Sequence, residues 1–278
     1  MSYDKSVSDH YLHGNLLNAI EKALPALGKT IETVTIEELA AVDEFHIGGR
    51  LATEHILKQL NLSKPGYLLD VGCGLGGAAR FIASKHKHHV AGIDLTAEYI
   101  DTGNSLSNWL NLDRFVSLIQ GSALSMPYQN NSFDGGYMLH VGMNIDDKLS
   151  LFTEIYRVLK PGAVFGIYDI MRQRDGELTY PVPWATDSNT SKLSTPYTYM
   201  QTLEQAGFAI TQENNGREFS LDFFKQLRIK AEINRGPPPL GLHLLMQESS
   251  ANKVENMLEN IKNELIAPVE IIALKALP

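Results

Sequence analysis

The segment Leu69-Asp-Val-Gly-Cys-Gly-Leu-Gly-Gly77 decides the fold. It follows the breaker cluster Ser63-Lys-Pro-Gly66, and it continues the apolar run of residues 67–71, which is typical of a buried parallel strand. The glycines then let the backbone turn tightly and approach a nucleotide-like ligand without a Cβ in the way. The sequence therefore predicts a strand, a glycine-rich turn and a helix, which is the start of a Rossmann-like α/β domain.

Strand-like apolar runs and helical patterns alternate along the rest of the chain. Beside the strand at 67–71, further strands are expected at 89–94, 115–119, 133–139, 163–170, 207–210 and 269–274. Helices are expected to end near Trp109, Leu159 and Ala206, and the turn Lys160-Pro-Gly162 should start the strand at 163–170. This alternation predicts a seven-stranded, mostly parallel sheet with helices on both faces.

Helical segments are expected before the sheet and late in the chain. Residues 1–62 should form an N-terminal helical segment or lid, with helices over 11–27, 35–42 and 50–60. Residues 63–278 should form the main domain, with cap insertions near 172–195 and 216–266. The second insertion is mostly helical in pattern and is interrupted at Arg235-Gly-Pro-Pro-Pro239. We expect this cap to determine the substrate.

The glycine segment fits two templates. Gly72, Gly74 and Gly77 satisfy the dinucleotide pattern G-x-G-x-x-G, whereas an acidic residue followed by x-G-x-G-x-G is the pattern of methyltransferases. Asp70 separates the two, because a pyrophosphate near this turn would meet a carboxylate, whereas the ammonium group of a methionine moiety would be attracted to it. The segment therefore favours S-adenosylmethionine over NAD as the cofactor.

A second acidic residue, Asp94, ends the next expected strand. A carboxylate there can accept hydrogen bonds from both ribose hydroxyls, and Leu95 beside it offers an apolar face to adenine. The separation from Gly72 is close to the roughly 20 residues that this fold requires. An Asp after a strand is more often a turn or N-cap residue, so this assignment depends on the glycine turn.

Five segments together resemble, in order, the motifs of class I S-adenosylmethionine-dependent methyltransferases. They are Leu69–Gly77, Gly92–Leu95, Gly121–Ala123 with Met126-Pro127, Ser132–Asp134 and Arg157–Gly162. The resemblance covers about residues 66–209. Residues 45–53 and 180–185 also resemble the sarcosine and dimethylglycine methyltransferases, neighbours of the ubiquinone and tocopherol enzymes. This implies methyl transfer to a small molecule, with an amine nitrogen as the first-choice acceptor and an oxygen or ring carbon next.

The resemblance and the motif chemistry imply a cofactor site. Its expected residues are Asp70, Gly72, Cys73, Gly74, Gly76, Asp94, Leu95, Ser122, Ala123 and His140. The family often has an acidic residue where this chain has Ser122, whose hydroxyl can accept from the adenine amino group but without charge assistance. The backbone of Ala123 and apolar contacts are the alternative means of holding adenine.

Polar residues after the fourth and fifth strands are the expected catalytic group, because ligands bind at the carboxyl ends of such strands. His140 and Asn144 follow the fourth strand, and Asp169 ends the fifth. His140 could contact the cofactor or take a proton from an amine or hydroxyl, and Asp169 could bind a substrate ammonium. The alternatives are a hydrogen-bonded strand-end histidine and a loop carboxylate.

Four further residues are expected at the substrate. They are His46, Arg50, Tyr168 and Trp184. His46 and Arg50 stand where the third helix begins and could close over the ligands, while Trp184 offers an aromatic wall. Their alternative role is ordinary packing of a loop or helix end.

Composition narrows the partners. The chain has 278 residues and a formal net charge of −8, which disfavours nucleic-acid binding through phosphate neutralisation. It has no apolar run of signal-peptide or membrane-span length, so a cytoplasmic location without membrane partners is expected. The single cysteine, Cys73, excludes an internal disulfide and a multi-cysteine zinc site, and no metal is expected. The composition leaves the oligomeric state undecided, with a homodimer as one alternative.

Three alternative functions also stay open at this point. The ambiguous glycine turn permits a nicotinamide-dependent oxidoreductase, although Asp70 and the Lys160-Pro-Gly162 turn disfavour it. A methyltransferase of RNA or protein is the second, and the net charge argues against its RNA form. A cofactor-binding scaffold without turnover is the third.

Overall fold

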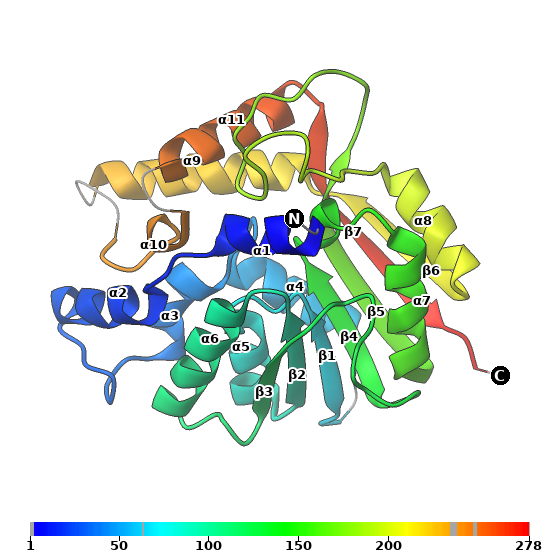
Figure 1. Ribbon diagram of the computed structural model, residues 1–278, viewed down its shortest axis with the longest axis horizontal. Helices are drawn as coiled ribbons and strands as arrows, with labels where there is room; N and C mark the ends of the chain where they lie inside the picture. The colour runs from blue at the N-terminus through cyan, green and yellow to red at the C-terminus, as the bar shows by residue number, and fades with distance from the viewer. Residues whose placement is uncertain (1–2, 63, 234–237, 247–248, 278) are drawn as a thin grey trace.

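The computed structural model describes residues 3–62, 64–233, 238–246 and 249–277. Its centre is a seven-stranded sheet with the strand order β3-β2-β1-β4-β5-β7-β6 (Figure 1). The strands are β1 (Tyr67–Val71), β2 (His89–Asp94), β3 (Val116–Gln120), β4 (Phe133–Leu139), β5 (Leu159–Arg172), β6 (Phe208–Asn215) and β7 (Ile266–Lys275). Strands β1 to β5 pair in parallel, whereas β7 runs antiparallel to β5 and β6. The expected seven-stranded, mostly parallel sheet is confirmed.

Helices cover both faces of this sheet. One layer contains α4 (Arg50–Gln59), α5 (Gly77–His86) and α6 (Ala97–Trp109), and the other contains α7 (Lys148–Val158) and α8 (Pro196–Gln205). Along β1 the side chains alternate, so that Leu68 packs toward α4 and α5 while Leu69 and Val71 pack toward α7. Continuous apolar strands are favourable here because both faces are buried.

The remaining helices belong to the N-terminal segment, to a short turn after β4 and to the cap. They are α1 (Tyr3–Tyr11), α2 (Leu16–Ala23), η1 (Leu24–Leu27), α3 (Ile36–Asp43), η2 (Gly142–Asn144), α9 (Arg217–Ile233), α10 (His243–Met246) and α11 (Ser250–Lys262). The cap helices α9 and α11 contact each other and lie side by side (Figure 1). All three cap helices fall between β6 and β7, within the insertion expected at 216–266.

Two local expectations are corrected. The single helix expected over 11–27 is interrupted at residues 12–15, where the Glu98 carboxylate accepts from the backbone N–H groups of His13, Gly14 and Leu16. A distant side chain therefore replaces the helical partners that these groups would need. The Lys160-Pro-Gly162 segment lies inside β5 rather than before it. Residue 63 and Arg235-Gly-Pro237, which fall in two of the expected breaks, lie outside the described residues.

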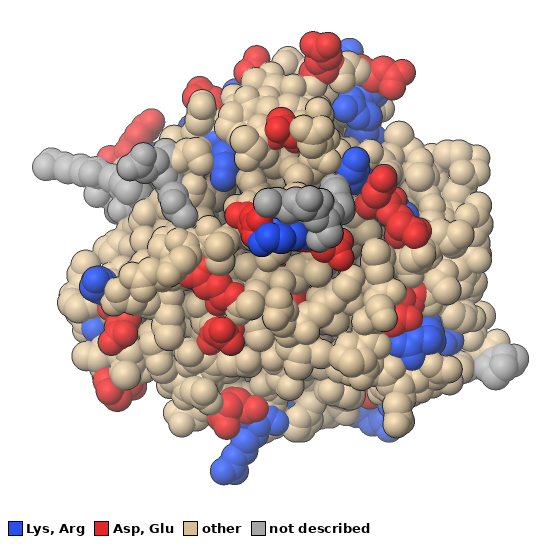
Figure 2. Space-filling model, viewed as in Figure 1, with Lys and Arg blue, Asp and Glu red and all other residues tan. Residues whose placement is uncertain are grey.

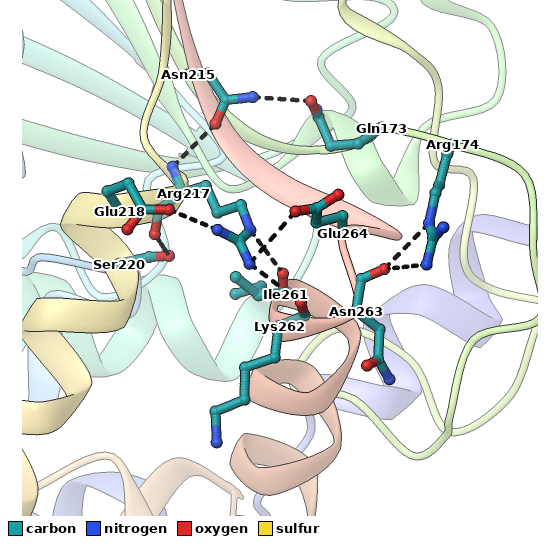
Figure 3. Close-up of polar contacts among 10 residues, drawn as sticks. All are labelled: Gln173, Arg174, Asn215, Arg217, Glu218, Ser220, Ile261, Lys262, Asn263 and Glu264. Atoms are coloured by element: carbon teal, nitrogen blue, oxygen red, sulfur yellow. Dashed lines mark hydrogen bonds and ion pairs between the residues drawn. The ribbon is translucent and has the colours of Figure 1, made fainter.

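Two arginines fasten the end of α11 to neighbouring segments (Figure 3). Arg217, at the start of α9, donates to the carbonyl oxygens of Ile261 and Lys262, each at 3.1 Å. Arg174, from the segment after β5, donates to the carbonyl oxygen of Asn263 at 2.6 Å. Guanidinium groups satisfy the unpaired carbonyls at a helix C-terminus and oppose its negative end. The cap helix is therefore held at its base.

The outer surface carries both signs of charge. On the face shown in Figure 2, basic side chains are scattered among acidic ones and form no continuous basic stripe over the residues described there. Among the described helices, none is long and apolar enough to span a membrane.

Candidate active site

The glycine turn after β1 has three residues with left-handed backbone, Gly72, Gly74 and Gly76, at φ +67°, +53° and +76°. A Cβ on Gly72 would lie 2.3 Å from the Val141 side chain, and one on Gly76 would lie 2.7 Å from Leu118. A Cβ on Gly74 would meet nothing closer than 4.0 Å, so this glycine borders open space. Gly72 and Gly76 therefore serve packing, while Gly74 leaves room for a ligand.

Asp94 links the glycine turn to β2. Its carboxylate accepts from the backbone N–H of Gly74 at 3.0 Å and from that of Thr96 at 2.9 Å. Each oxygen keeps a lone pair, so the carboxylate can still accept from two ribose hydroxyls. Burial raises the pKa of Asp94 above its usual value, which shows that the ionised group lacks full solvation.

Asp70, near the end of β1, is 3% exposed and accepts from the Tyr137 hydroxyl at 3.0 Å. Burial raises its pKa from 3.8 to about 7, against the opposing effect of that hydrogen bond. Of the described residues that line the adjoining cavity, none is a Lys or Arg. A bound cation would therefore be the favourable partner for this carboxyl group.

Asp70 and Asp94 lie on the wall of the first cavity, which has a volume of about 350 Å³ and lies within the range of small-molecule sites. We call it the cofactor cavity. The expected cofactor residues on its wall are Asp70, Gly72, Cys73, Gly74, Asp94, Leu95, Ser122, Ala123 and His140. Gly76 is not on the wall, because it is the N-cap of α5 and packs against Leu118. The Ser122 hydroxyl oxygen accepts from the Leu124 N–H at 3.3 Å.

His140, directly after β4, has left-handed backbone with φ +56°. Such a conformation costs about 1 kcal/mol or more in a residue other than glycine, and it concentrates at functional sites. The ring nitrogen Nε2 is buried and hydrogen-bonds to no described residue. Burial lowers the pKa of His140 well below its usual value, with His46 as the secondary cause, so the imidazole is neutral at pH 7.

A second cavity, of about 410 Å³, lies against the cap, and we call it the cap cavity. Its wall is mostly apolar and includes Met143, Trp184, Phe223, Phe224, Leu227, Met246, Val254 and Met257. Four residues line both cavities and are named here the collar: Tyr11, Phe45, His46 and His140. Two ligands, one bound in each cavity, would therefore contact each other at the collar.

The structure separates the expected substrate residues. His46 and Trp184 line the cap cavity, whereas Arg50 and Tyr168 line neither cavity. Arg50 is paired with Glu44 and stacks over the Phe81 ring at 4.0 Å. The Tyr168 ring packs behind His140, with ring centroids 5.2 Å apart. These two residues support the site from outside.

Asp169 requires a correction. The side chain is fully buried, accepts from the Tyr199 hydroxyl at 2.6 Å and lines neither cavity. Helix α8 supplies Tyr199, and Asp169 lies inside β5, which continues to Arg172 rather than ending at Asp169 as expected. We therefore assign Asp169 no catalytic or substrate-binding role.

Asn144 lines the cofactor cavity, but its side chain is engaged with other segments. It accepts from the Tyr11 hydroxyl at 2.9 Å and donates to the carbonyl oxygens of Trp184 and Thr190. Asn144 therefore joins α1 and the 172–195 segment to the end of β4. A positioning role fits these contacts better than contact with reacting atoms.

Tyr11 and Phe45 were not among the expected site residues. Tyr11 fits the apolar pattern of the expected first helix, and Phe45 precedes the glycine pair at 48–49. Sequence patterns gave no signal for Tyr11, because the position of α1 depends on distant contacts such as the one with Asn144. The aromatic residues of α9 do show helical spacing, which is compatible with a lid as well as with core packing.

The fold and the carboxylate-lined cavity at the strand ends define a class I methyltransferase with an S-adenosylmethionine site. Residues 69–167 match the family model described as a methyltransferase domain. The chain therefore carries a class I S-adenosylmethionine-dependent methyltransferase domain, and S-adenosylmethionine is its cofactor. This disfavours the NAD alternative.

Several relatives in sequence are sterol methyltransferases. A 24-methylenesterol C-methyltransferase 2 of Arabidopsis thaliana is 37% identical over 107 residues, which is 38% of this chain and 30% of that protein. A cycloartenol-C-24-methyltransferase of the same plant is 25% identical over 236 residues, 77% of this chain and 70% of that protein. For the first of these, the chain thus spans less than a third of the relative's length.

Solved structures confirm the fold along the whole chain. Geranyl diphosphate C-methyltransferase of Streptomyces coelicolor A3(2), solved with S-adenosylhomocysteine, has a TM-score of 0.72 at 17% identity and covers 99% of both chains. Phosphoethanolamine N-methyltransferase 2 of Haemonchus contortus, solved with S-adenosylmethionine, has a TM-score of 0.67 at 21% identity. It covers 92% of this chain and 60% of that one. The fold therefore occurs with carbon and nitrogen acceptors alike.

Proposed function

We propose that this protein transfers a methyl group from S-adenosylmethionine to a small apolar molecule held in the cap cavity. One observation carries the proposal: a carboxylate-lined cavity and an apolar cavity meet at a shared collar of four side chains. S-adenosylmethionine, when bound, supplies an electrophilic methyl group on a cationic sulfur. Asp70 would hold its ammonium group and Asp94 its ribose, which directs the methyl group toward the collar.

The protein's main task in this reaction is positioning. In-line methyl transfer requires the acceptor atom to be held against the methyl carbon with water excluded. The collar supplies two aromatic rings and two imidazoles at this point, and the cap closes the far side. His140, with its unpartnered Nε2, would hold the acceptor by a hydrogen bond or a ring contact.

An uncharged acceptor fits the cap cavity best, and carbon is the favoured acceptor atom. Glu44 is the one Asp, Glu, Lys or Arg among the described residues of its wall. The Glu44 carboxylate is already paired with Arg50 and bonded to Thr53. An ammonium or phosphate group would therefore lose its hydration without a compensating charge. An alkene carbon is compatible with apolar walls.

The amine acceptor implied by the sequence resemblance is kept as the second candidate. The observation that favours it is the pair of neutral imidazoles at the collar, which can accept an N–H proton from an uncharged amine. The apolar wall would select amines with large apolar substituents over amino-acid amines.

The test is transfer of an isotopically labelled methyl group by the full chain. The acceptor panel contains apolar alkenes of terpenoid and sterol type, apolar amines, and sarcosine-like amines, with products identified by mass spectrometry. We expect transfer to an apolar acceptor, first at carbon. Transfer to sarcosine-like amines alone would overturn the apolar assignment. Tight S-adenosylmethionine binding without transfer to any acceptor would support the scaffold alternative instead.

A further inference from the structure

We infer that Glu44 and Thr53 are positioning residues that fix His46 as the proton acceptor of the reaction. The inference rests on the proposed function, because methylation of a C–H or an N–H acceptor requires the loss of one proton. All three side chains are at least nine-tenths buried, with exposed fractions of 3%, 1% and 9%. His46 belongs to the collar and faces both cavities.

The hydrogen bonds around His46 have a defined direction. Nε2 lies 3.0 Å from the carbonyl oxygen of Gly49, which can only accept, so Nε2 carries the proton. Nε2 also lies 3.1 Å from the Thr53 hydroxyl oxygen, and this hydroxyl donates its own proton to Glu44 at 2.8 Å. Both contacts require the same tautomer. Nδ1 is therefore the ring nitrogen with a free lone pair, and it bonds to no described residue.

The second imidazole of the collar lacks such support. His140 Nε2 hydrogen-bonds to no described residue, and its ring neighbours are His46 and Tyr168. A proton on His140 would thus be buried without a countercharge. A proton on His46 would share the Glu44 carboxylate with Arg50, because a carboxylate oxygen of Glu44 lies 3.8 Å from Nε2 and another pairs with Arg50. Burial and the Arg50 charge lower the pKa of His46 to about 4, so its imidazolium would be a transient state. Of the two rings, His46 is the one arranged to become an imidazolium.

Methyl transfer leaves a positive charge on the acceptor, which the loss of one proton removes. The acceptor's electron pair forms the new bond to the methyl carbon, and the carbon–sulfur bond breaks with its electrons remaining on sulfur. An alkene acceptor then has a carbocation beside the new bond, whereas an amine acceptor has a positive nitrogen. Loss of a C–H or N–H proton to His46 Nδ1 restores a neutral product. The imidazolium returns this proton to solvent when the product leaves.

Nitrogen NMR of histidine-labelled protein tests the arrangement without substrate or cofactor. His46→Gln assigns the signals. We expect the wild-type ring to be neutral at pH 7, with the proton on Nε2 and a lone-pair shift at Nδ1. Thr53→Val removes the hydroxyl and should weaken this tautomer preference, whereas Thr53→Ser should keep it. A proton on Nδ1 in the wild type, or a spectrum unchanged by Thr53→Val, overturns the inference.

Kinetics with an acceptor from the panel separates positioning from packing. Valine keeps the shape of Thr53 without its hydroxyl, and serine keeps the hydroxyl without the methyl group. A positioning role predicts a fall in kcat of about 100-fold for Thr53→Val, with partial rescue by Thr53→Ser and unchanged S-adenosylmethionine affinity. A packing role predicts that valine is tolerated better than serine, which would overturn the inference. No transfer by the wild type, with the expected tautomer present, refutes the proposed function instead.

Discussion

Replacing Asp70 by Asn should stabilise the cofactor-free protein while weakening cofactor binding. Burial raises the pKa of Asp70 from 3.8 to about 7, which corresponds to a cost of about 4 kcal/mol for keeping the group ionised at pH 8. Asparagine keeps an oxygen for the Tyr137 hydroxyl, but its amide N–H groups cost about 1–3 kcal/mol if they stay unpaired. The net gain is about 2 kcal/mol, which raises Tm by about 4–8 °C.

The gain should depend on pH with a definite sign. Because the folded-state pKa is raised, the ionised carboxyl destabilises the wild type only above the unfolded value of 3.8, and fully above about 7. The difference in Tm between Asp70→Asn and wild type should therefore be largest at pH 8. It should shrink as the pH falls, vanish near pH 5 and have the opposite sign near pH 4, because the cost of the unpaired amide remains when the carboxyl group is protonated in both states. Thermal unfolding at four or five pH values measures it.

Cofactor affinity should change in the opposite direction. A charge-assisted hydrogen bond to the ammonium group contributes about 1.5–3 kcal/mol, so Asp70→Asn should raise the Kd for S-adenosylmethionine about 10- to 150-fold by calorimetry. Asp169→Asn is the matched control, since Asp169 is equally buried but lies outside both cavities, and its Kd should stay unchanged. An Asp70→Asn protein that melts below wild type at pH 8, or that binds the cofactor as tightly, would refute the reasoning.

Three further predictions concern the turn, the collar and the cap. Gly74→Ala should weaken S-adenosylmethionine binding about tenfold or more in calorimetry, because its Cβ would enter the cofactor cavity. Gly28→Ala is the control and should leave the Kd unchanged, because Gly28 has a similar left-handed backbone but lines neither cavity. His140→Asn should lower the transfer rate about 100-fold at an unchanged Tm, because Asn tolerates positive φ. A wild-type transfer rate would contradict the proposal that His140 holds the acceptor at the collar. Phe224→Ala should raise KM for an apolar acceptor about tenfold or more without affecting cofactor affinity, and an effect confined to the cofactor would place the acceptor elsewhere.

The cofactor half of the site follows from local rules that a sequence displays. The strand before Gly72 is apolar because both sheet faces are covered, and the glycines that follow it need left-handed backbone. In a parallel sheet, adjacent strands end at the same edge, so Asp94 must lie close to that turn. These relations involve one turn and one crossover, and the sequence alone predicts both.

The acceptor half depends on contacts between distant segments. In the sequence Asp94 and Asp169 both come after a run of mostly apolar residues, but Asp94 ends β2 whereas Asp169 lies inside β5. They differ because Tyr199, 30 residues further along, covers Asp169, whereas nothing in the described chain fills the space beside Asp94 in this way. The collar likewise requires α1 to lie across the end of β4, a placement set by Tyr11 and Asn144. Neither contact has a periodicity or spacing that would show it in advance.

The wall of the cofactor cavity carries buried acidic groups whose negative charge is not balanced by any described basic residue of the wall. A cationic ligand can balance it. Burial raises the pKa of Asp43, Asp70 and Asp94, and among the described residues of the cavity wall no Lys or Arg offsets them, although Arg80 pairs with Asp43 from behind. S-adenosylmethionine carries an ammonium, a sulfonium and a carboxylate, so its binding brings a net charge of +1 to a wall that disfavours its own negative charges. Methyl transfer converts the sulfonium to a neutral thioether, so the net charge of the bound molecule falls from +1 to zero. The carboxyl groups that favour binding of S-adenosylmethionine therefore bind S-adenosylhomocysteine less strongly. This difference favours replacement of the product by a new molecule of S-adenosylmethionine.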